Sequence, residues 1–281
     1  MLVFLNGKFV PEEQAVVSVF DRSFLYGDGL FEAIPISNGR PFRWAQHMAR
    51  FQRGADMLKI SVPHSNDELR KFATQLAEHN RMPDALMRLT LSRGVGLRGY
   101  SPRGAEQPTL VMSLHPLPEF DLENPPRWKL ITSSQRLPAG EPLAQFKTCN
   151  KLPQILARAQ ADAAGADEAL LLNTDGYVAE GTTSNLFWVS EGVVCTPPLA
   201  SGVLPGVTRL VVLEICRELK IPVDEIAPRP KELMFAQGVF LSMSSFGIFE
   251  ATMLDGRPLQ TSSLLKKIHR RYREIVENES R

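Results

Sequence analysis

Long hydrophobic runs are missing from this sequence. No stretch approaches the roughly 18 to 20 apolar residues that a membrane-spanning helix needs. The apolar start Met1–Leu5 is broken at Asn6-Gly7, which is too early for the apolar core of a signal peptide. We therefore expect a cytoplasmic protein that does not enter a membrane.

Cysteine, histidine and net charge are also scarce. The three cysteines, Cys149, Cys195 and Cys216, are widely spaced, which argues against a disulfide framework. The five histidines include no closely spaced pair, so no metal site is expected. A net charge of +1 gives no long-range field for nucleic acid or an anionic membrane. A small molecule is the expected partner.

The residues that are present suit an ordinary globular protein. With 281 residues, 43% of them hydrophobic and 22% charged, the chain can form one large or two medium domains. Hydrophobic periodicity and turn residues predict an α+β order of elements. The first half should contain a hairpin turning at Asn6-Gly7, strands near 30–36, 86–93 and 109–114, and helices over 44–58 and about 65–80, the second opened by the capping-box pattern Ser65-Asn-Asp-Glu68.

A proline-rich segment interrupts this pattern. Four of the eleven residues 116–126 are proline, which breaks both helical and strand periodicity. We predict an N-terminal α+β domain over 1–117, a linker over 118–127 and a C-terminal domain over 128–281. The second domain should contain a strand over 128–133, a helix over 152–164, a hairpin over 169–179, a helix over 207–220, strands near 239–243 and 251–254, and a terminal helix.

The segment from Glu180 to Arg209 gives the clearest chemical signal. Glu180 ends a predicted hairpin, where rigid β structure can aim its carboxylate inward. Gly206 lets the backbone approach a ligand, and Val207 and Thr208 begin a helix whose free N–H groups can hold a phosphate. A phosphate site beside an acid suits pyridoxal phosphate, whose pyridine nitrogen needs an anionic partner.

Pyridoxal phosphate also requires a lysine, and two lysines compete for this role. Lys147 lies between a Pro/Gly-rich loop and a helical run, a position that suits a Schiff-base amine. Lys151 is four residues on, and the two would share a helix face if the helix began early. Lysines near a helix start are usually solvated, so spacing alone does not decide between them.

Several segments together resemble the class IV pyridoxal-phosphate enzymes, which include branched-chain aminotransferases, D-amino-acid aminotransferases and aminodeoxychorismate lyases. The likeness covers nearly the whole chain. It is carried by Phe4-Leu-Asn6-Gly7-Lys8-Phe9, Asp21-Arg22, Tyr26-Gly27-Asp28-Gly29-Leu-Phe31-Glu32, His47-Met-Ala-Arg50-Phe and the Glu180–Arg209 segment. It implies fold type IV, with two α/β domains, pyridoxal 5'-phosphate between them, and a homodimer.

The resemblance also implies roles for individual residues. Lys147, three residues before Asn150, would form the Schiff base and move the proton, and Glu180 would pair with the pyridine nitrogen. The phosphate would be bound by Arg50, Val207, Thr208 and Ser244. Arg50 also fits a bland alternative, because it falls on an amphipathic helix and could be one more surface arginine.

The stretch Gly94-Val-Gly96-Leu-Arg98-Gly99 matches a dinucleotide-binding pattern and follows a strand. It leads into Tyr100-Ser-Pro rather than a helix, so its context rejects a nicotinamide enzyme. By resemblance it is the substrate loop of aminodeoxychorismate lyases, with Arg98 and Tyr100 near a substrate carboxylate. The bland alternative is a surface loop with a solvated arginine.

The resemblance leaves the reaction open between two kinds of enzyme. D-amino-acid aminotransferases have a tyrosine where this chain has Phe31, and branched-chain enzymes have a tyrosine where this chain has Lys151. We therefore predict an aminodeoxychorismate lyase, which converts 4-amino-4-deoxychorismate to 4-aminobenzoate and pyruvate in folate biosynthesis. A class IV aminotransferase is the alternative. A non-catalytic cofactor-binding protein is a third hypothesis, which the presence of Lys147 disfavours.

Overall fold

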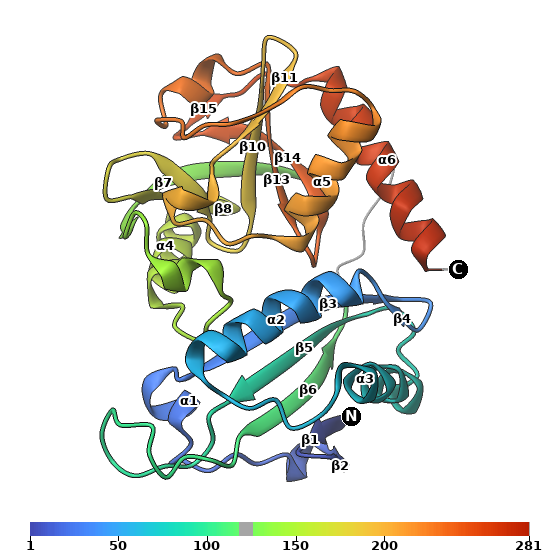
Figure 1. Cartoon of the computed structure of the whole chain (residues 1–281). Coiled ribbons are helices and arrows are strands. Elements are labelled where there is room, and N and C mark those ends of the chain that lie inside the picture. Colours follow the sequence, from blue (N-terminus) through green and yellow to red (C-terminus); the bar gives the residue numbers. More distant parts are fainter. Residues whose placement is uncertain (118–125, 281) are drawn as a thin grey trace. The chain divides into compact units, whose positions relative to one another are not determined.

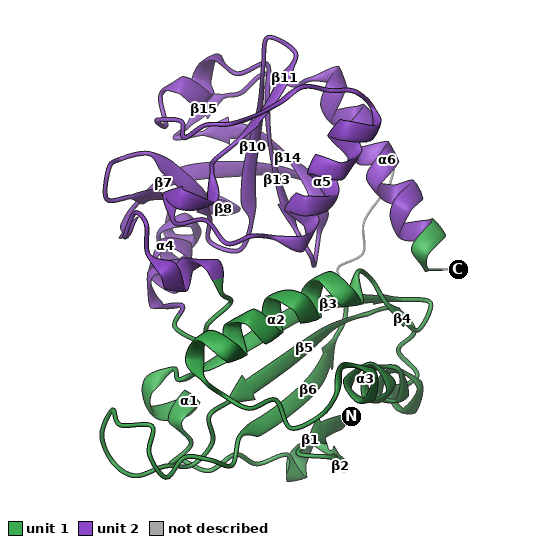
Figure 2. Ribbon diagram, viewed as in Figure 1, with its two compact units in different colours: residues 1–118, 146–150, 278–281 green, residues 119–145, 151–277 purple. Residues whose placement is uncertain are grey.

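The computed structural model describes residues 1–117 and 126–280 and divides into two compact units (Figure 2). Unit 1 comprises residues 1–118, 146–150 and 278–281, and unit 2 comprises residues 119–145 and 151–277. The chain therefore returns to unit 1 for the five residues around Lys147. Most of the predicted linker, residues 118–125, lies outside the described residues, and the predicted domain limits stay a prediction.

Unit 1 is built on a six-stranded antiparallel sheet in the order β2-β1-β6-β5-β3-β4 (Figure 1). Its strands are β1 (Leu2–Leu5), β2 (Lys8–Pro11), β3 (Gly29–Ser37), β4 (Arg40–Pro41), β5 (Ala85–Ser92) and β6 (Thr109–His115). Its helices are η1 (Glu12–Gln14), α1 (Arg22–Tyr26), α2 (Trp44–Leu58) and α3 (Asn66–Asn80).

Buried and half-buried residues alternate along β3, so one face of the sheet is covered by the core. Leu30, Ile34 and Ile36 are buried and alternate with half-buried residues, as expected of a strand with one face against a core. The apolar face of α2, including Met48 and Phe51, packs into the same core.

The predicted capping box at the start of α3 is confirmed, because the Ser65 and Glu68 side chains each bond the other's backbone N–H.

Unit 2 contains a nine-stranded mixed sheet with the main order β12-β11-β10-β13-β14-β7-β8-β9, and β15 pairs with β14. Its strands are β7 (Arg127–Leu137), β8 (Glu168–Asn173), β9 (Val178–Gly181), β10 (Asn185–Ser190), β11 (Val193–Thr196), β12 (Val223–Glu225), β13 (Gly238–Met243), β14 (Gly247–Leu254) and β15 (Arg257–Pro258). β9 and β10 contact each other although they lie far apart in this order, so the sheet curls round.

The helices of unit 2 are η2 (Pro142–Gln145), α4 (Leu152–Ala163), η3 (Leu199–Ser201), α5 (Val207–Glu218), η4 (Glu232–Phe235) and α6 (Ser263–Glu279), of which the last two residues fall in unit 1. The second-half helices and the hairpin begin within a residue or two of their predicted positions. The strand predicted to begin at Ala251 instead begins at Gly247, because Ile248 and Phe249 also pair with β13. These two residues point to opposite faces of the strand and are both buried, so both faces of β14 are covered at this end.

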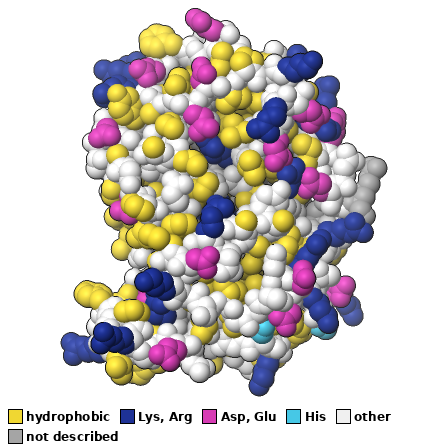
Figure 3. All heavy atoms as spheres, in the orientation of Figure 1, with side chains coloured by type: hydrophobic (Ala, Val, Ile, Leu, Met, Phe, Trp, Pro, Cys, Tyr) yellow, Lys and Arg dark blue, Asp and Glu magenta, His cyan; other side chains and the backbone are white. Residues whose placement is uncertain are grey.

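The surface carries charges of both signs. Lys, Arg, Asp and Glu side chains are interspersed over the face drawn in Figure 3, in keeping with the net charge of +1. Across the described ranges, no helix is both long and apolar enough to span a membrane. The same ranges hold no cluster of three or more His, Cys, Asp or Glu side chains arranged to bind a metal ion.

The segment between β5 and β6 depends on a glycine at its start. Gly94 has a φ of +88°, and a Cβ added there would overlap the carbonyl oxygen of Gln107. We expect Gly94→Ala to lower the free energy of unfolding by about 1 to 3 kcal/mol, because it adds both backbone strain and a clash. Chemical denaturation of the purified variant measures this.

Gly104→Ala is the matched control for that measurement. Gly104 lies in the same segment at a φ of +77°, but its added Cβ would meet only the Leu97 side chain at ordinary contact distance, 3.7 Å. The control should therefore lose less stability than Gly94→Ala. Equal losses would show that backbone strain, and not the Gln107 contact, makes glycine necessary at position 94.

Candidate active site

Lys147 lies in an extended segment beside β3 rather than at the start of a helix. Its carbonyl accepts a hydrogen bond from the Phe31 N–H at 2.9 Å, and Cys149 N–H donates to the Gly29 carbonyl at 2.9 Å. An isolated bridge pairs Leu30 with Thr148. The lysine is therefore held by strand-like pairing in unit 1. α4 begins only at Leu152, as predicted, so Lys147 and Lys151 do not share a helix face.

The Phe31 ring lies beside two cationic groups. Lys147 Nζ is 4.7 Å from the ring centroid, and the Arg88 guanidinium carbon is 3.8 Å from it. Arg88 lies on β5, directly opposite Ala33 of β3. Ala33 is two residues from Phe31 on the same face of the strand, so Arg88 and Phe31 are diagonal neighbours. Arg88 is exposed, so its charge can meet a ligand. No motif in the sequence marks this arginine.

A buried ion pair lies on the adjacent residue of β3. Glu32 is 1% exposed and accepts hydrogen bonds from Arg50 Nε at 2.7 Å and Nη2 at 2.6 Å. His47 Nδ1 is 2.8 Å from the same carboxylate. Burial would raise the pKa of Glu32, but the charge of Arg50 and the bonds from His47 and Arg50 hold it at about 2.

His47 is buried within the same cluster. Burial lowers its pKa below the ordinary 6.5, while the hydrogen bond and charge of Glu32 oppose this shift. The charges of Arg50 and Lys147 add to the lowering. A neutral ring then donates from Nδ1 to Glu32. Arg50, predicted to bind phosphate, thus also fixes Glu32, and its contact with a phosphate stays a prediction.

In unit 2, Glu180 lies at the end of β9 and fixes the approach to α5. Its Oε2 accepts a hydrogen bond from the Leu204 N–H at 2.9 Å, and Asn185 Nδ2 donates to the Leu204 carbonyl at 2.9 Å. Gly206 follows, where an added Cβ would overlap Asn185 Oδ1. Glu180 and Asn185 are therefore both hydrogen-bonded to Leu204, two residues before Gly206.

The first turn of α5 has no side-chain cap from its N-cap residue. The helix begins at Val207, and its N-cap residue Gly206 offers no side-chain hydrogen bond to the first turn. Val207 and Thr208 supply N–H groups in that turn, and Thr208 also supplies a hydroxyl. Ser244, the fourth predicted phosphate contact, lies in the turn between β13 and β14. Its contact with a phosphate stays a prediction.

A second acid in unit 2 was missed by sequence reasoning. Glu168 is fully buried at the start of β8 and accepts hydrogen bonds from the backbone N–H groups of Ala169 and Thr182. The hydroxyls of Thr182, Thr183 and Ser184 also bond this carboxylate. Glu168 therefore fixes the loop that follows Glu180. The only sequence signal for it is an acid directly before an apolar strand.

The predicted site residues thus fall into two groups. Unit 1 holds Phe31, Arg50, Arg98, Tyr100 and Lys147, and unit 2 holds Glu180, Val207, Thr208 and Ser244. Within unit 1, Lys147 and Phe31 are in contact, and Arg50, on α2, bonds Glu32, the residue after Phe31 on β3. Within unit 2, the contacts of Glu180 reach the segment that leads into α5.

Comparison with known proteins decides the family. Residues 29–253 match the family described as Amino-transferase class IV. The chain belongs to the class IV aminotransferase family. A relative from Methanocaldococcus jannaschii, named "Putative branched-chain-amino-acid aminotransferase", is 36% identical over 98% of this chain and 96% of its own length.

Solved structures of class IV enzymes confirm the predicted fold type IV. The branched-chain aminotransferase of Thermoproteus uzoniensis, solved with norvaline, is 32% identical, with a TM-score of 0.92 over 99% of this chain and 95% of that one. The "Putative 4-amino-4-deoxychorismate lyase" of Legionella pneumophila is 29% identical, with a TM-score of 0.86 over 96% of this chain and 97% of that one.

The class IV family depends on pyridoxal 5'-phosphate, and a branched-chain aminotransferase of the same fold was solved with pyridoxamine 5'-phosphate. The residues of this enzyme fit that cofactor. The uncapped start of α5 suits the phosphate, because its first N–H groups have no capping side chain. The carboxylate of Glu180 suits a protonated pyridine nitrogen, and Lys147 would supply the amine. The expectation of a pyridoxal-phosphate enzyme is therefore confirmed at the level of the family.

The Glu32–Arg50 pair yields a prediction about stability. We expect Glu32→Gln to lower the free energy of unfolding at pH 7 by about 3 to 5 kcal/mol, because it leaves the Arg50 charge buried without its counter-ion. The pKa of Glu32 is held at about 2, below the ordinary 4.5. Its contribution is therefore full above pH 4.5 and is lost as the pH falls toward 2. Between these pH values the free energy of unfolding should therefore fall less in Glu32→Gln than in the wild type.

Urea unfolding from about pH 7 down to about pH 3 measures both effects. Glu78→Gln is the control, because Glu78 is an exposed acid on α3, where a surface substitution should change stability by no more than about 0.5 kcal/mol. If Glu32→Gln were as stable as the control at neutral pH, the buried pair would not stabilise unit 1.

Proposed function

We propose that this class IV enzyme is an aminodeoxychorismate lyase, which forms 4-aminobenzoate and pyruvate. The observation that carries the proposal is a pair of exposed arginines in the unit that holds Lys147. Arg88 lies against the Phe31 ring at 3.8 Å, beside Lys147, and Arg98 lies on the segment between β5 and β6. The substrate carries two carboxylates, and a guanidinium is the side chain best suited to bind each of them.

Each predicted residue has a part in this reaction. Pyridoxal phosphate, when bound, draws electrons away from the substrate carbon. Lys147 holds the cofactor and moves the proton, and Glu180 keeps the pyridine nitrogen protonated. Arg50, Val207, Thr208 and Ser244 hold the phosphate. Phe31 supplies an apolar face beside the reacting centre, and Arg98 and Tyr100 orient the substrate.

An aminotransferase is the second candidate. It is favoured by the 36% identity to the Methanocaldococcus jannaschii relative, which is named for branched-chain amino acids. Arg88 would then bind the carboxylate of an amino acid or a 2-oxo acid. The two reactions differ in one requirement, because an aminotransferase needs a 2-oxo acid to complete its cycle and a lyase does not.

This difference gives the test. The purified holoenzyme, incubated with aminodeoxychorismate generated in the tube and without any 2-oxo acid, should form 4-aminobenzoate, which is followed by its fluorescence. Lys147→Ala should abolish the reaction, because no other amine would replace it, whereas Lys151→Ala should keep most of it. Arg88→Leu should raise KM about tenfold or more, because a charged hydrogen bond contributes about 1.5 to 3 kcal/mol.

Other results would reject the lyase. If no 4-aminobenzoate forms while the cofactor remains bound, and amino acids with 2-oxoglutarate are turned over, the enzyme is an aminotransferase. A protein that binds the cofactor and turns over neither substrate set would be the non-catalytic binder. An active Lys147→Ala variant combined with an inactive Lys151→Ala variant would transfer the amine role to Lys151.

We also propose that the enzyme acts as a homodimer, as its family resemblance implies. Large apolar side chains are exposed on α4, where Leu152, Ile155 and Leu156 are 69%, 59% and 51% exposed. Phe24 on α1 is 74% exposed. Exposed apolar groups of this kind are typical of surfaces that meet another protein chain.

Analytical ultracentrifugation tests the dimer. The wild type should sediment as a dimer, and Ile155→Glu should shift it toward the monomer by placing a charge in the apolar contact. Lys71→Glu also places an acidic side chain at an exposed helix position, but on α3 and away from these apolar groups, and is the control. A monomeric wild type at micromolar concentration would refute the dimer.

A further inference from the structure

The segment between β5 and β6, where Arg98 and Tyr100 lie, has little regular structure of its own. β5 ends at Ser92 and β6 begins at Thr109, and Val95 makes only an isolated bridge with Asp21. Arg98 is exposed, and Tyr100 is 86% exposed. Side chains on such a segment can be positioned accurately only if other groups fix its backbone.

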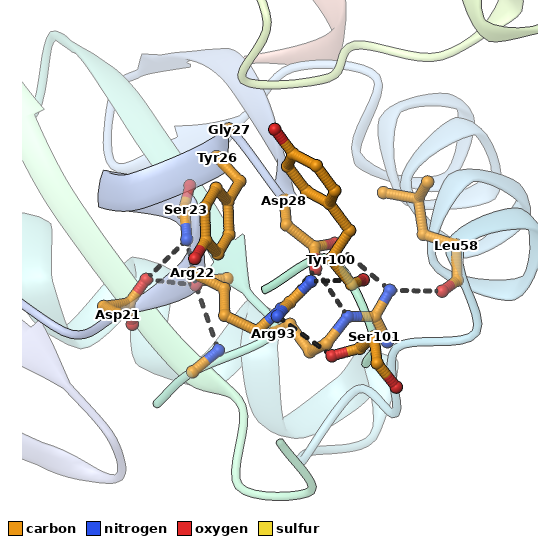
Figure 4. A network of polar contacts seen from close by, with 12 residues as sticks. Asp21, Arg22, Ser23, Tyr26, Gly27, Asp28, Leu58, Arg93, Tyr100 and Ser101 are labelled. Atoms are coloured by element: carbon orange, nitrogen blue, oxygen red, sulfur yellow. Dashed lines mark hydrogen bonds and ion pairs between the residues drawn. The ribbon is translucent and has the colours of Figure 1, made fainter. Parts of the chain in front are cut away.

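The side chain of Arg22 fixes this backbone directly (Figure 4). Its Nη1 donates to the Gly99 carbonyl at 2.9 Å and the Ser101 carbonyl at 3.1 Å, and its Nη2 donates to the Tyr100 carbonyl at 3.0 Å. One guanidinium thus binds three consecutive carbonyl groups. The side chain is only 4% exposed, so these bonds are made with little competition from water.

An acid sets the direction of this guanidinium. Arg22 Nε donates to Asp28 Oδ2 at 2.8 Å, which turns the two Nη groups toward residues 99–101. Asp28 also binds Arg93, whose other bonds go to the carbonyls of Leu58 and Lys59 (Figure 4). The two arginines therefore share one carboxylate, and Arg22 is the one that bonds residues 99–101.

Tyr26 strengthens the contact from α1. Its hydroxyl accepts a hydrogen bond from the Gly99 N–H at 3.2 Å, and its ring lies edge-on to the Tyr100 ring with centroids 5.6 Å apart. The Arg22 guanidinium lies 5.1 Å from the Tyr26 ring centroid. The peptide groups on both sides of Gly99 are thus held by α1, directly after Arg98.

We propose that Arg22 is a positioning residue that aims Arg98 and Tyr100 at the substrate carboxylate. It acts through the backbone of residues 99–101 and does not touch the substrate. The proposal rests on the proposed function in one respect, namely that Arg98 and Tyr100 contact the substrate. A lysine cannot replace Arg22, because an ammonium group lacks the planar fork that reaches three carbonyls and Asp28 together.

Hydrogen exchange tests the first half of the proposal. In the holoenzyme, Arg22→Lys and Arg22→Gln should both increase the exchange of backbone amides in residues 97–103, because the backbone loses its bonds to the guanidinium. Arg93→Gln is the matched control, since it removes the other guanidinium on Asp28 and none of the bonds to residues 99–101. Unchanged exchange in both Arg22 variants would overturn the proposal.

Kinetics test the second half with aminodeoxychorismate as the probe. Arg22→Lys should raise KM about tenfold or more while the absorbance of the bound cofactor stays unchanged. In an Arg98→Gln background the same change should raise KM by a clearly smaller factor, because Arg22 then positions only Tyr100. Effects of Arg22 and Arg98 that multiply independently would overturn the proposal.

The failure of the proposed function has a different signature. If Arg98→Gln leaves KM unchanged, Arg98 does not bind the substrate and the lyase assignment loses its second arginine. The exchange measurement still decides whether Arg22 fixes residues 99–101. If the holoenzyme turns over only amino acids with 2-oxoglutarate, the KM for 2-oxoglutarate is measured in the same variants, with the same expected pattern.

Discussion

The pairing of β3 with its neighbours is the constraint on which the site in unit 1 depends. Successive residues of a strand point to opposite faces, so Phe31 and Glu32 serve different purposes. Phe31 lies beside Lys147 and Arg88, and Glu32 binds His47 and Arg50 from α2. The backbone of the same strand also bonds the Lys147 segment. A shift of β3 by one residue would exchange the two faces and dismantle both arrangements.

Acidic side chains hold the less regular parts of both units in place. Asp28 orients Arg22, which bonds residues 99–101, and Arg93, which bonds the end of α2. Glu168 accepts hydrogen bonds from the hydroxyls of the loop after β9, and Glu180 accepts one from the Leu204 N–H, ahead of α5. Each acid accepts bonds from groups that β pairing leaves unsatisfied. A ligand placed against these segments would therefore meet a backbone that is already ordered, which reduces the entropy lost on binding.

The sequence predicted the elements of the fold well, since their signals are local. The helix over 44–58 and the capping box at Ser65 follow from periodicity and short-range bonds, and both are confirmed. The contacts of Glu32 could not be derived in this way, because its partners lie 15 and 18 residues away on another element. The spacing of His47 and Arg50 on one helix face was visible, but nothing in the sequence showed which strand this face would meet.

Lys147 is a second residue whose supporting contacts could not be predicted from the sequence. Its position before a helix suggested an element boundary, and α4 does begin a few residues later. What holds it, however, is hydrogen bonding to β3, more than a hundred residues earlier in the chain. This pairing fixes the backbone on both sides of the lysine, whose Nζ lies 4.7 Å from the centroid of the Phe31 ring. A lysine placed on the first turn of α4, as Lys151 nearly is, would have a fraying helix end as its support, which is a weaker basis for positioning an amine.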